Sequence, residues 1–246
     1  MAYSRWKRLE KTPGYRRIKL FLKRLAGKEL RLKPQLDVSI VKAGGWWFHP
    51  DTLNSESIVY SFGIGEDVEF DLFLIKRFGL DVHAFDPTPA TIEWLAARQL
   101  PASFRFYPWA VAARNGFLRL YPRLKRDGSR STVMYSTFGD RASAIESIDV
   151  PAVNLPAIAK RLGHEQIDLL KMDIEGAEYE VLDNLLQSTV KPRQLLVEFH
   201  HRFSGIGPTR TAAMIARLEE YGYRLIAVSE TGRELSFMHT CEEQRS

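Results

Sequence analysis

The stretch that decides the fold runs from Ile58 to Asp67 and reads IVYSFGIGED. Its first five residues are rich in β-branched and aromatic side chains, which predicts a short buried strand. Gly63 and Gly65 follow at once, and glycine lets the backbone turn sharply and lets a ligand come close. A dinucleotide-binding fingerprint would place a third glycine at Val68, where it is missing. The stretch therefore predicts a strand-to-helix turn at a ligand site that is not built for a pyrophosphate.

Outward from this stretch, strand patterns alternate with helical spacing. Strands are predicted at Ile58–Phe62, Asp81–Phe85, Phe104–Val111, Ile167–Met172, Gln194–Phe199, Tyr223–Val228 and Glu234–Met238. Helical spacing is found in Val68, Leu72 and Ile75, and in Thr88–Arg98, Pro156–Leu162, Ala177–Leu186 and Thr211–Tyr221. This alternation is typical of a Rossmann-like α/β fold, here with a seven-stranded, mostly parallel sheet and helices on both faces. The tight turn between the last two strands predicts that the final strand is antiparallel.

One region departs from the alternation. Phe117–Tyr121 follows the turn at Asn115-Gly116 and predicts an extra strand. Arg123–Ile148 is polar and weakly periodic, so we expect a long loop there, of the kind that often forms a lid.

The charge is distributed unevenly over the 246 residues. Met1 to Lys33 carry a net charge of +10, and the remaining residues carry −5. We therefore expect a basic arm at residues 1–34 and one α/β domain at residues 35–246. An acidic domain does not favour nucleic acid as a partner.

The arm contains an amphipathic pattern. Ile18, Phe21, Leu22 and Leu25 recur at helical spacing among Lys and Arg residues. Such a helix can dock on an anionic membrane or an acidic partner, or it can pack its apolar stripe on the domain. No apolar run is long enough to span a bilayer, no secretory signal is evident, and the single cysteine, Cys241, fits a reducing compartment. We expect a cytoplasmic protein whose arm can lie at the inner face of the membrane or on an acidic partner.

Acidic residues follow the first two strands. Asp86 ends the second strand about 20 residues after the glycines, where a carboxylate can accept hydrogen bonds from a ribose diol. Glu66 and Asp67 would repel a phosphate, and they suit a ligand with a cationic amino-acid end. S-adenosylmethionine has both a ribose and such an end, so these residues favour it as the cofactor.

A second acidic group follows the strand that ends at Met172. Asp173, Glu175 and Glu178 lie in a strand-to-helix loop, where carboxylates can orient a hydroxyl, take its proton or hold a metal. Capping and helix-dipole effects explain one of the three carboxylates more easily than all three. His200 and His201 follow the next strand and are further candidates for a general base.

These pieces together resemble the FkbM-type methyltransferases. The resemblance covers about Val59 to Phe199 and is most specific in Asp173–Glu178. It is carried by Tyr60–Gly65, Ala84–Pro87, Trp109–Val111 with Asn115-Gly116, and Ile167–Glu178. It implies a class I fold, S-adenosylmethionine as methyl donor, and a hydroxyl acceptor on a sugar, polyketide or related metabolite. Ser61 stands where members commonly carry an acid, and Glu66 or Asp67 can take over that contact.

The resemblance and the residue patterns assign two sets of site residues and no metal ligand. The residues expected to contact S-adenosylmethionine are Ser61, Phe62, Gly63, Gly65, Asp67, Asp86, Pro87, Trp109, Ala110 and Asp173. The residues expected to be catalytic are Asp173, Glu175 and His200. Two alternatives remain, a nicotinamide-dependent oxidoreductase and a binding module that keeps the fold without catalysis. The missing third glycine counts against the first, and the acidic set counts against the second.

Overall fold

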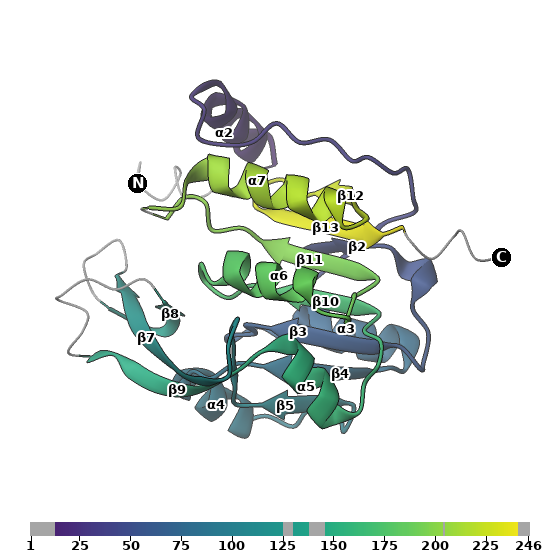
Figure 1. Ribbon diagram of the computed structural model, residues 1–246, viewed down its shortest axis with the longest axis vertical. Helices are drawn as coiled ribbons and strands as arrows, with labels where there is room; N and C mark the ends of the chain where they lie inside the picture. The colour runs from purple at the N-terminus through teal and green to yellow at the C-terminus, as the bar shows by residue number, and fades with distance from the viewer. Residues whose placement is uncertain (1–12, 125–129, 138–145, 204, 241–246) are drawn as a thin grey trace, which may run out of the picture.

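A computed structural model describes residues 13–124, 130–137, 146–203 and 205–240. The start of the predicted arm and Cys241 lie outside the described residues. Seven strands form the central sheet in the order β12-β13-β11-β10-β3-β4-β5 (Figure 1). Their bounds are β3 Ile58–Phe62, β4 Asp81–Phe85, β5 Phe104–Tyr107, β10 Leu169–Met172, β11 Gln194–Glu198, β12 Tyr223–Val228 and β13 Glu234–His239. Strand β13 runs antiparallel to both neighbours while β3, β4, β5, β10 and β11 pair in parallel, which confirms the predicted sheet.

Helices cover both faces of this sheet, as predicted. One face carries α5, α6 and α7, which lie in front of the strands in Figure 1. The other face carries α3, α4 and a hairpin. The bounds are α3 Glu69–Phe78, α4 Pro89–Ala96, α5 Leu155–Leu162, α6 Glu178–Gln187 and α7 Gly207–Glu220. Successive strand residues point to opposite faces, so Tyr60 and Phe62 pack under α5 to α7 while Val59 packs under α3.

The hairpin was not predicted from the sequence. Its strands are β1 (Val41–Ala43) and β2 (Trp46–Phe48), with Gly44 and Gly45 at the turn. Phe48 is fully buried and meets the ring of Phe70 on α3 edge to face at 5.9 Å. Strands of three residues are too short to show an alternation in the sequence.

A second sheet stands beside the first. Its order is β6-β9-β7-β8, with β6 Ala110–Val111, β7 Gly116–Leu124, β8 Arg130–Ser136 and β9 Ile148–Val153. Figure 1 shows it projecting from the main sheet at the lower left. The predicted strand at Phe117–Tyr121 is confirmed as part of β7.

Two predictions in this region are wrong. The strand predicted at Phe104–Val111 divides into β5 and β6, because the chain leaves the main sheet at Pro108, which cannot donate a ladder hydrogen bond. The loop predicted at Arg123–Ile148 contains β8, and β9 begins at its last residue. Residues 125–129 and 138–145 of that region lie outside the described residues.

The arm contains helix α2 (Pro13–Leu25), which lies at the top of the molecule in Figure 1. Within the part of the chain that the structure describes, no helix has the length and apolar character needed to cross a bilayer.

Candidate active site

A cavity of about 310 Å³ opens at the carboxyl ends of β3, β4 and β10, between the two sheets. The main sheet lines it with the glycine loop, with the residues after β4 and with the acidic loop after β10. The second sheet lines the facing side with Ala110, Val111, Leu118, Leu120, Met134 and Tyr135. The carboxyl ends of parallel strands are where α/β sheets bind ligands. Of this wall, sequence reasoning predicted only Ala110 as a contact, and it expected Met134 and Tyr135 to lie in a loop.

The glycine loop is held by both neighbouring strands. Gly63 donates its N–H to Phe85 O at 2.9 Å, and Lys171 Nζ donates to Gly63 O at 3.2 Å. Gly63 has a φ of 70°, and a Cβ placed on it would lie 1.7 Å from the carbonyl oxygen of Asp173. The loop after β3 therefore touches the loop after β10, and this contact requires glycine.

Asp86 connects the glycine loop to the next strand. The residue is 5% exposed, and its Oδ2 accepts the Gly65 N–H at 3.0 Å. Its Oδ1 accepts from Thr88 N at 2.9 Å and from Thr88 Oγ1 at 2.7 Å. A carboxylate has about four acceptor positions, so three are filled by the protein and one is left for a ligand in the cavity.

The predicted cofactor contacts divide into two groups. The cavity is lined by Gly63, Gly65, Asp86, Pro87, Trp109, Ala110 and Asp173. Ser61 and Phe62 are fully buried behind the loop and are not among the lining residues. Asp67 is exposed, and its Oδ1 accepts the N–H of Glu69 at the start of α3, at 2.9 Å. Ser61 and Phe62 therefore support the loop from below, and Asp67 makes its hydrogen bond to the backbone at the start of α3.

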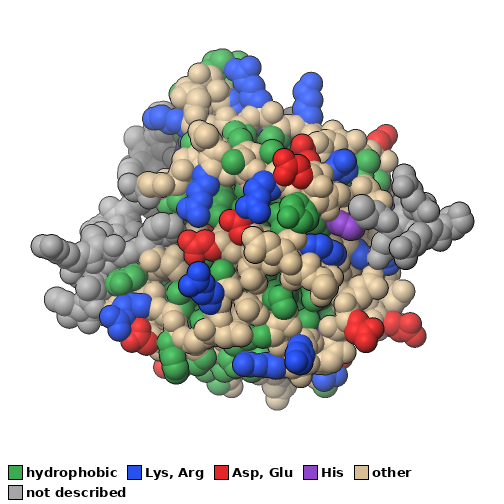
Figure 2. Space-filling view, viewed as in Figure 1, with side chains coloured by type: hydrophobic (Ala, Val, Ile, Leu, Met, Phe, Trp, Pro, Cys, Tyr) green, Lys and Arg blue, Asp and Glu red, His purple; other side chains and the backbone are tan. Residues whose placement is uncertain are grey.

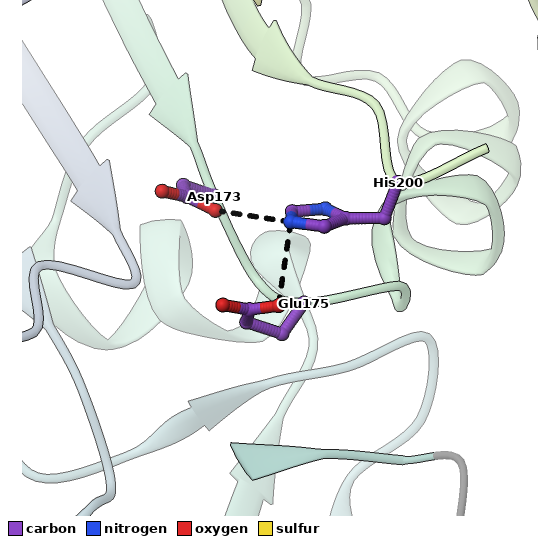
Figure 3. Close-up of side chains that lie close together, drawn as sticks. All are labelled: Asp173, Glu175 and His200. Atoms are coloured by element: carbon purple, nitrogen blue, oxygen red, sulfur yellow. Dashed lines mark ion pairs between the residues drawn. The ribbon is translucent and has the colours of Figure 1, made fainter. Parts of the chain in front are cut away.

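The acidic loop and the strand beside it converge on one imidazole. Figure 3 shows Asp173 and Glu175 approaching the same ring nitrogen of His200. The distances from His200 Nε2 are 3.3 Å to Glu175 Oε2 and 3.8 Å to Asp173 Oδ1, and Glu198 Oε1 lies at 3.9 Å. The other ring nitrogen, Nδ1, lies 2.8 Å from Glu178 Oε1. His200 is thus surrounded by four carboxyl groups.

Glu178 fixes this arrangement. It is the first residue of α6 and is fully buried. Besides His200, its Oε1 accepts the N–H groups of Ile174 at 3.2 Å and Gly176 at 3.0 Å, so one carboxylate orients both the loop and the imidazole. The loop itself is tightly turned, since Glu175 has a φ of 53°.

The carboxyl groups decide the charge of His200. Burial lowers its pKa, but the hydrogen bond to Glu178 and the charges of Glu178, Asp173 and Glu175 outweigh burial and raise the pKa to about 9. His200 is therefore an imidazolium at neutral pH and cannot accept a proton there. Burial raises the pKa of Asp173 and of Glu175, which makes both carboxylates stronger bases than usual. Burial and the neighbouring Asp173 raise the pKa of Glu198 to about 8.

Two residues of the second sheet reach Glu175. Arg123 Nη1 lies 2.5 Å from Glu175 Oε2, and Ser136 Oγ donates to Glu175 O at 2.9 Å. Sequence reasoning missed both, because Arg123 and Ser136 lie 52 and 39 residues from Glu175 in the chain. The polar character of the segment was visible, but the pairing across the cavity was not.

The two adjacent histidines point to different places. His200 joins the acidic cluster, whereas His201 is buried with its Nε2 at 3.0 Å from Glu29 Oε2 in the arm. Arg202 Nε also contacts Glu29. The segment after β11 therefore connects the site on one side with the arm on the other.

Asp173, Glu175 and His200 also have the spacing of a metal site. Their ligand atoms all lie within 4.8 Å of one another, and they offer carboxylate oxygens and one imidazole nitrogen. A cation bound to Nε2 would have to displace the proton that the carboxyl groups hold on the ring, which weakens binding at neutral pH. The absence of a metal from the reaction stays a prediction.

Comparison with known proteins adds family relationships. A family model described as the Methyltransferase FkbM domain matches residues 45–225. Probable methyltransferase-like protein 24 of Homo sapiens is 27% identical over 183 residues, and that of Rattus norvegicus is 25% identical over 193 residues. These matches cover 70% and 75% of this chain but 42% and 43% of the relatives, so the chain spans less than half their length.

Solved structures resemble the chain more distantly. The fibrillarin pre-rRNA processing protein of Methanococcus jannaschii has a TM-score of 0.44 at 11% sequence identity, covering 85% of this chain and 86% of its own.

Proposed function

Because the chain belongs to the FkbM methyltransferase family, we propose that it transfers a methyl group from S-adenosylmethionine to a hydroxyl group of a sugar, polyketide or related metabolite. One observation carries the proposal. The cavity that begins at the glycine loop and Asp86 ends at two basic carboxylates, Asp173 and Glu175. The proposed nucleoside site and the proposed proton acceptor would thus lie in one cavity.

The residues present fit S-adenosylmethionine. The cavity of about 310 Å³ is at the small end of the usual range for ligand pockets. Asp86 has one acceptor position left for a ribose hydroxyl, and the ring of Trp109 offers an aromatic surface for the adenine of the cofactor. The acidic loop suits a cation, since a positive charge beside Asp173 and Glu175 would offset their mutual repulsion.

S-adenosylmethionine, when bound, would supply an electrophilic methyl group, whose bond to sulfur breaks so that S-adenosylhomocysteine is the leaving group. Asp173 takes the proton of the acceptor hydroxyl as the new oxygen–carbon bond forms, and its raised pKa suits that task. The imidazolium of His200 lies behind both carboxylates and holds them in place, as a positioning residue. Holding the hydroxyl in line with the methyl group supplies much of the remaining rate enhancement.

The second sheet supplies the acceptor side. Leu118, Leu120, Met134 and Tyr135 face the acidic loop across the cavity and offer mainly apolar surface. Arg123 fixes Glu175 from the same sheet. This wall suits an acceptor with an apolar face, such as a polyketide or the carbon face of a sugar ring.

The cofactor is tested first, by calorimetry of the purified protein with S-adenosylhomocysteine and with NAD. Binding of S-adenosylhomocysteine and not of NAD is expected, and the reverse result would replace the proposal with a nicotinamide-dependent reaction. A panel of sugar and polyketide hydroxyls then identifies an acceptor by mass spectrometry.

Once an acceptor is known, the variant Asp173→Asn tests whether Asp173 is the general base. It keeps the shape of the side chain and removes the charge, so kcat is expected to fall by about 10²–10⁴ while the dissociation constant of S-adenosylhomocysteine changes little. Glu165→Gln is the matched control, because Glu165 is exposed and is not a lining residue. Turnover by Asp173→Asn at the wild-type rate would remove Asp173 from the chemistry.

A further inference from the structure

Helix α2 turns its apolar side outward. Ile18 is 63% exposed, and Phe21, Leu22 and Leu25 are each 58% exposed. The sequence allowed two arrangements for this stripe, packed on the domain or in contact with a partner, and the structure shows that these four side chains are not packed on the described part of the domain. Figure 1 places α2 at the edge of the molecule, and Figure 2 shows Lys, Arg and apolar side chains at the same end.

The opposite side of α2 holds the helix on the domain. Leu20 is 9% exposed and packs against the turn between β12 and β13, where its Cδ1 would lie 2.9 Å from a Cβ on Gly232. Arg24 Nε donates to Leu30 O at 3.1 Å, and Lys23 Nζ lies 3.8 Å from Glu29 Oε1. The orientation of the stripe is therefore set by contacts and is not that of a free tail.

Glu29 links the arm to the domain. It is 4% exposed and binds His201 and Arg202 as well as Lys23. Hydrogen bonds from His201 and Arg202 hold the pKa of Glu29 below its usual value, against the opposing effect of burial. The arm is thus joined to the segment that follows β11 and carries His200.

The basic residues of α2 indicate what kind of surface the apolar stripe contacts. Pro13 to Leu25 contain Arg16, Arg17, Lys19, Lys23 and Arg24 and no acidic residue. An apolar stripe flanked by basic residues is the pattern of helices that lie in the interface of an anionic bilayer. Pairing of two α2 stripes would bring two strongly basic helices together, which like-charge repulsion opposes.

We propose that α2 docks this protein on an anionic lipid bilayer. Phe21, Leu22 and their neighbours enter the headgroup region, while the exposed Lys19 contacts lipid phosphates. The apolar contact requires exposed side chains on one side of the helix, and the electrostatic contact requires anionic lipid.

Co-sedimentation with vesicles tests the docking, using the full chain and no cofactor or acceptor, so that the result is independent of the proposed reaction. Vesicles of phosphatidylcholine with 30% phosphatidylserine (about one lipid in three) are compared with pure phosphatidylcholine. We expect binding to the first, little to the second, and a loss of binding when salt is raised to about 0.5 M.

Two variants locate the surface. Phe21→Ser with Leu22→Ser removes apolar area without changing charge, and Lys19→Glu reverses one charge; all three side chains are exposed, so folding should be kept. Binding should weaken at least about tenfold in the double variant and severalfold in Lys19→Glu. Phe117→Ser and Lys76→Glu make the same kinds of change at exposed positions on β7 and α3 and should bind as wild type.

Three results would overturn the proposal. The first is that the wild-type protein sediments with neither kind of vesicle. The second is that the double variant, with an unchanged unfolding midpoint, binds as well as wild type. The third is a concentration-dependent dimer that the double variant abolishes while vesicles stay unbound, since the stripe would then serve a second copy of this chain.

Discussion

Replacing Gly63 by alanine should damage the molecule more than the same change at an equally strained glycine. Gly63 and Gly163 have φ values of 70° and 73°. A left-handed conformation costs alanine about 1–2 kcal/mol at either position. At Gly163 nothing lies within 4 Å of the added Cβ, whereas at Gly63 the Cβ would lie 1.7 Å from the carbonyl oxygen of Asp173.

The difference between the two variants isolates that contact. Forcing an extra methyl group into a packed site costs about 1–3 kcal/mol, so the free energy of unfolding should fall by about 2–5 kcal/mol in Gly63→Ala and about 1–2 kcal/mol in Gly163→Ala. Urea unfolding measures both. The shift also moves the Asp173 backbone at the cavity, so only Gly63→Ala should weaken binding of S-adenosylhomocysteine. Equal losses of stability and unchanged binding in both variants would show that the two loops are not in contact.

Three further predictions use other parts of the structure. Asp86→Asn should weaken S-adenosylhomocysteine binding by about 10- to 150-fold, which corresponds to the loss of one charge-assisted hydrogen bond. Calorimetry measures this, with Asp67→Asn at an exposed position as the control, and equal effects of the two variants would show that Asp86 does not contact the ribose. Burial first, and then the charge of His164, lower the pKa of His83 to about 4. In the unfolded chain His83 has a pKa near 6.5 and binds the proton more tightly, so His83 should lower the free energy of unfolding by about 2 kcal/mol between pH 7.5 and pH 5. Urea unfolding at both pH values should show a smaller decrease in His83→Gln, and the same decrease in wild type and variant would contradict this. Methyl transfer should persist after dialysis against EDTA, and activity restored only by Mn²⁺ or Mg²⁺ would instead assign a cation to the cluster around His200.

The main sheet could be predicted from the sequence because its central strands, β3, β4, β10 and β11, are buried on both faces. Their apolar runs end at glycine, Asp-Pro or acidic residues, so both the strands and the functional edge stand out. The antiparallel last strand followed from the short turn at residues 230–232. These features depend on local patterns and on rules of connection that apply to any α/β sheet.

The second sheet could be predicted only in part because its strands are half exposed and pair across long intervals. In β7, Leu118 and Leu120 face inward, while Phe117 is 80% exposed and Arg119 pairs with Asp149 on β9. Alternation of this kind indicated one strand but not its partners. Pairing of β7 with β9 joins residues about thirty positions apart, which no local pattern specifies.

The candidate site shows the same division. Asp86 and Asp173 were predicted because each directly follows a strand, and Glu175 because it lies in the same strand-to-helix loop as Asp173. His200 was predicted as a candidate base, yet its charge depends on Glu178, 22 residues away in the sequence, and on how deeply the cluster is buried. Position in the sequence therefore indicates which groups meet, whereas burial and pairing decide their protonation.

The charge of His200 shapes the proposed chemistry. Two neighbouring carboxylates that were both ionised in a buried cavity would repel each other and raise the cost of folding. An imidazolium between Asp173 and Glu175 offsets that repulsion and leaves Asp173 at the cavity surface, where it can take a proton. A neutral His200 would remove the compensation, and one carboxyl group would then take up a proton and lose its basicity. His200 thus assists the reaction through its positive charge. We expect His200→Gln to lower kcat while KM changes less, and to move the acidic limb of the pH–rate profile to higher pH, because the pKa of Asp173 would rise without the neighbouring positive charge. An unchanged pH profile in that variant would show that the base does not depend on the imidazolium.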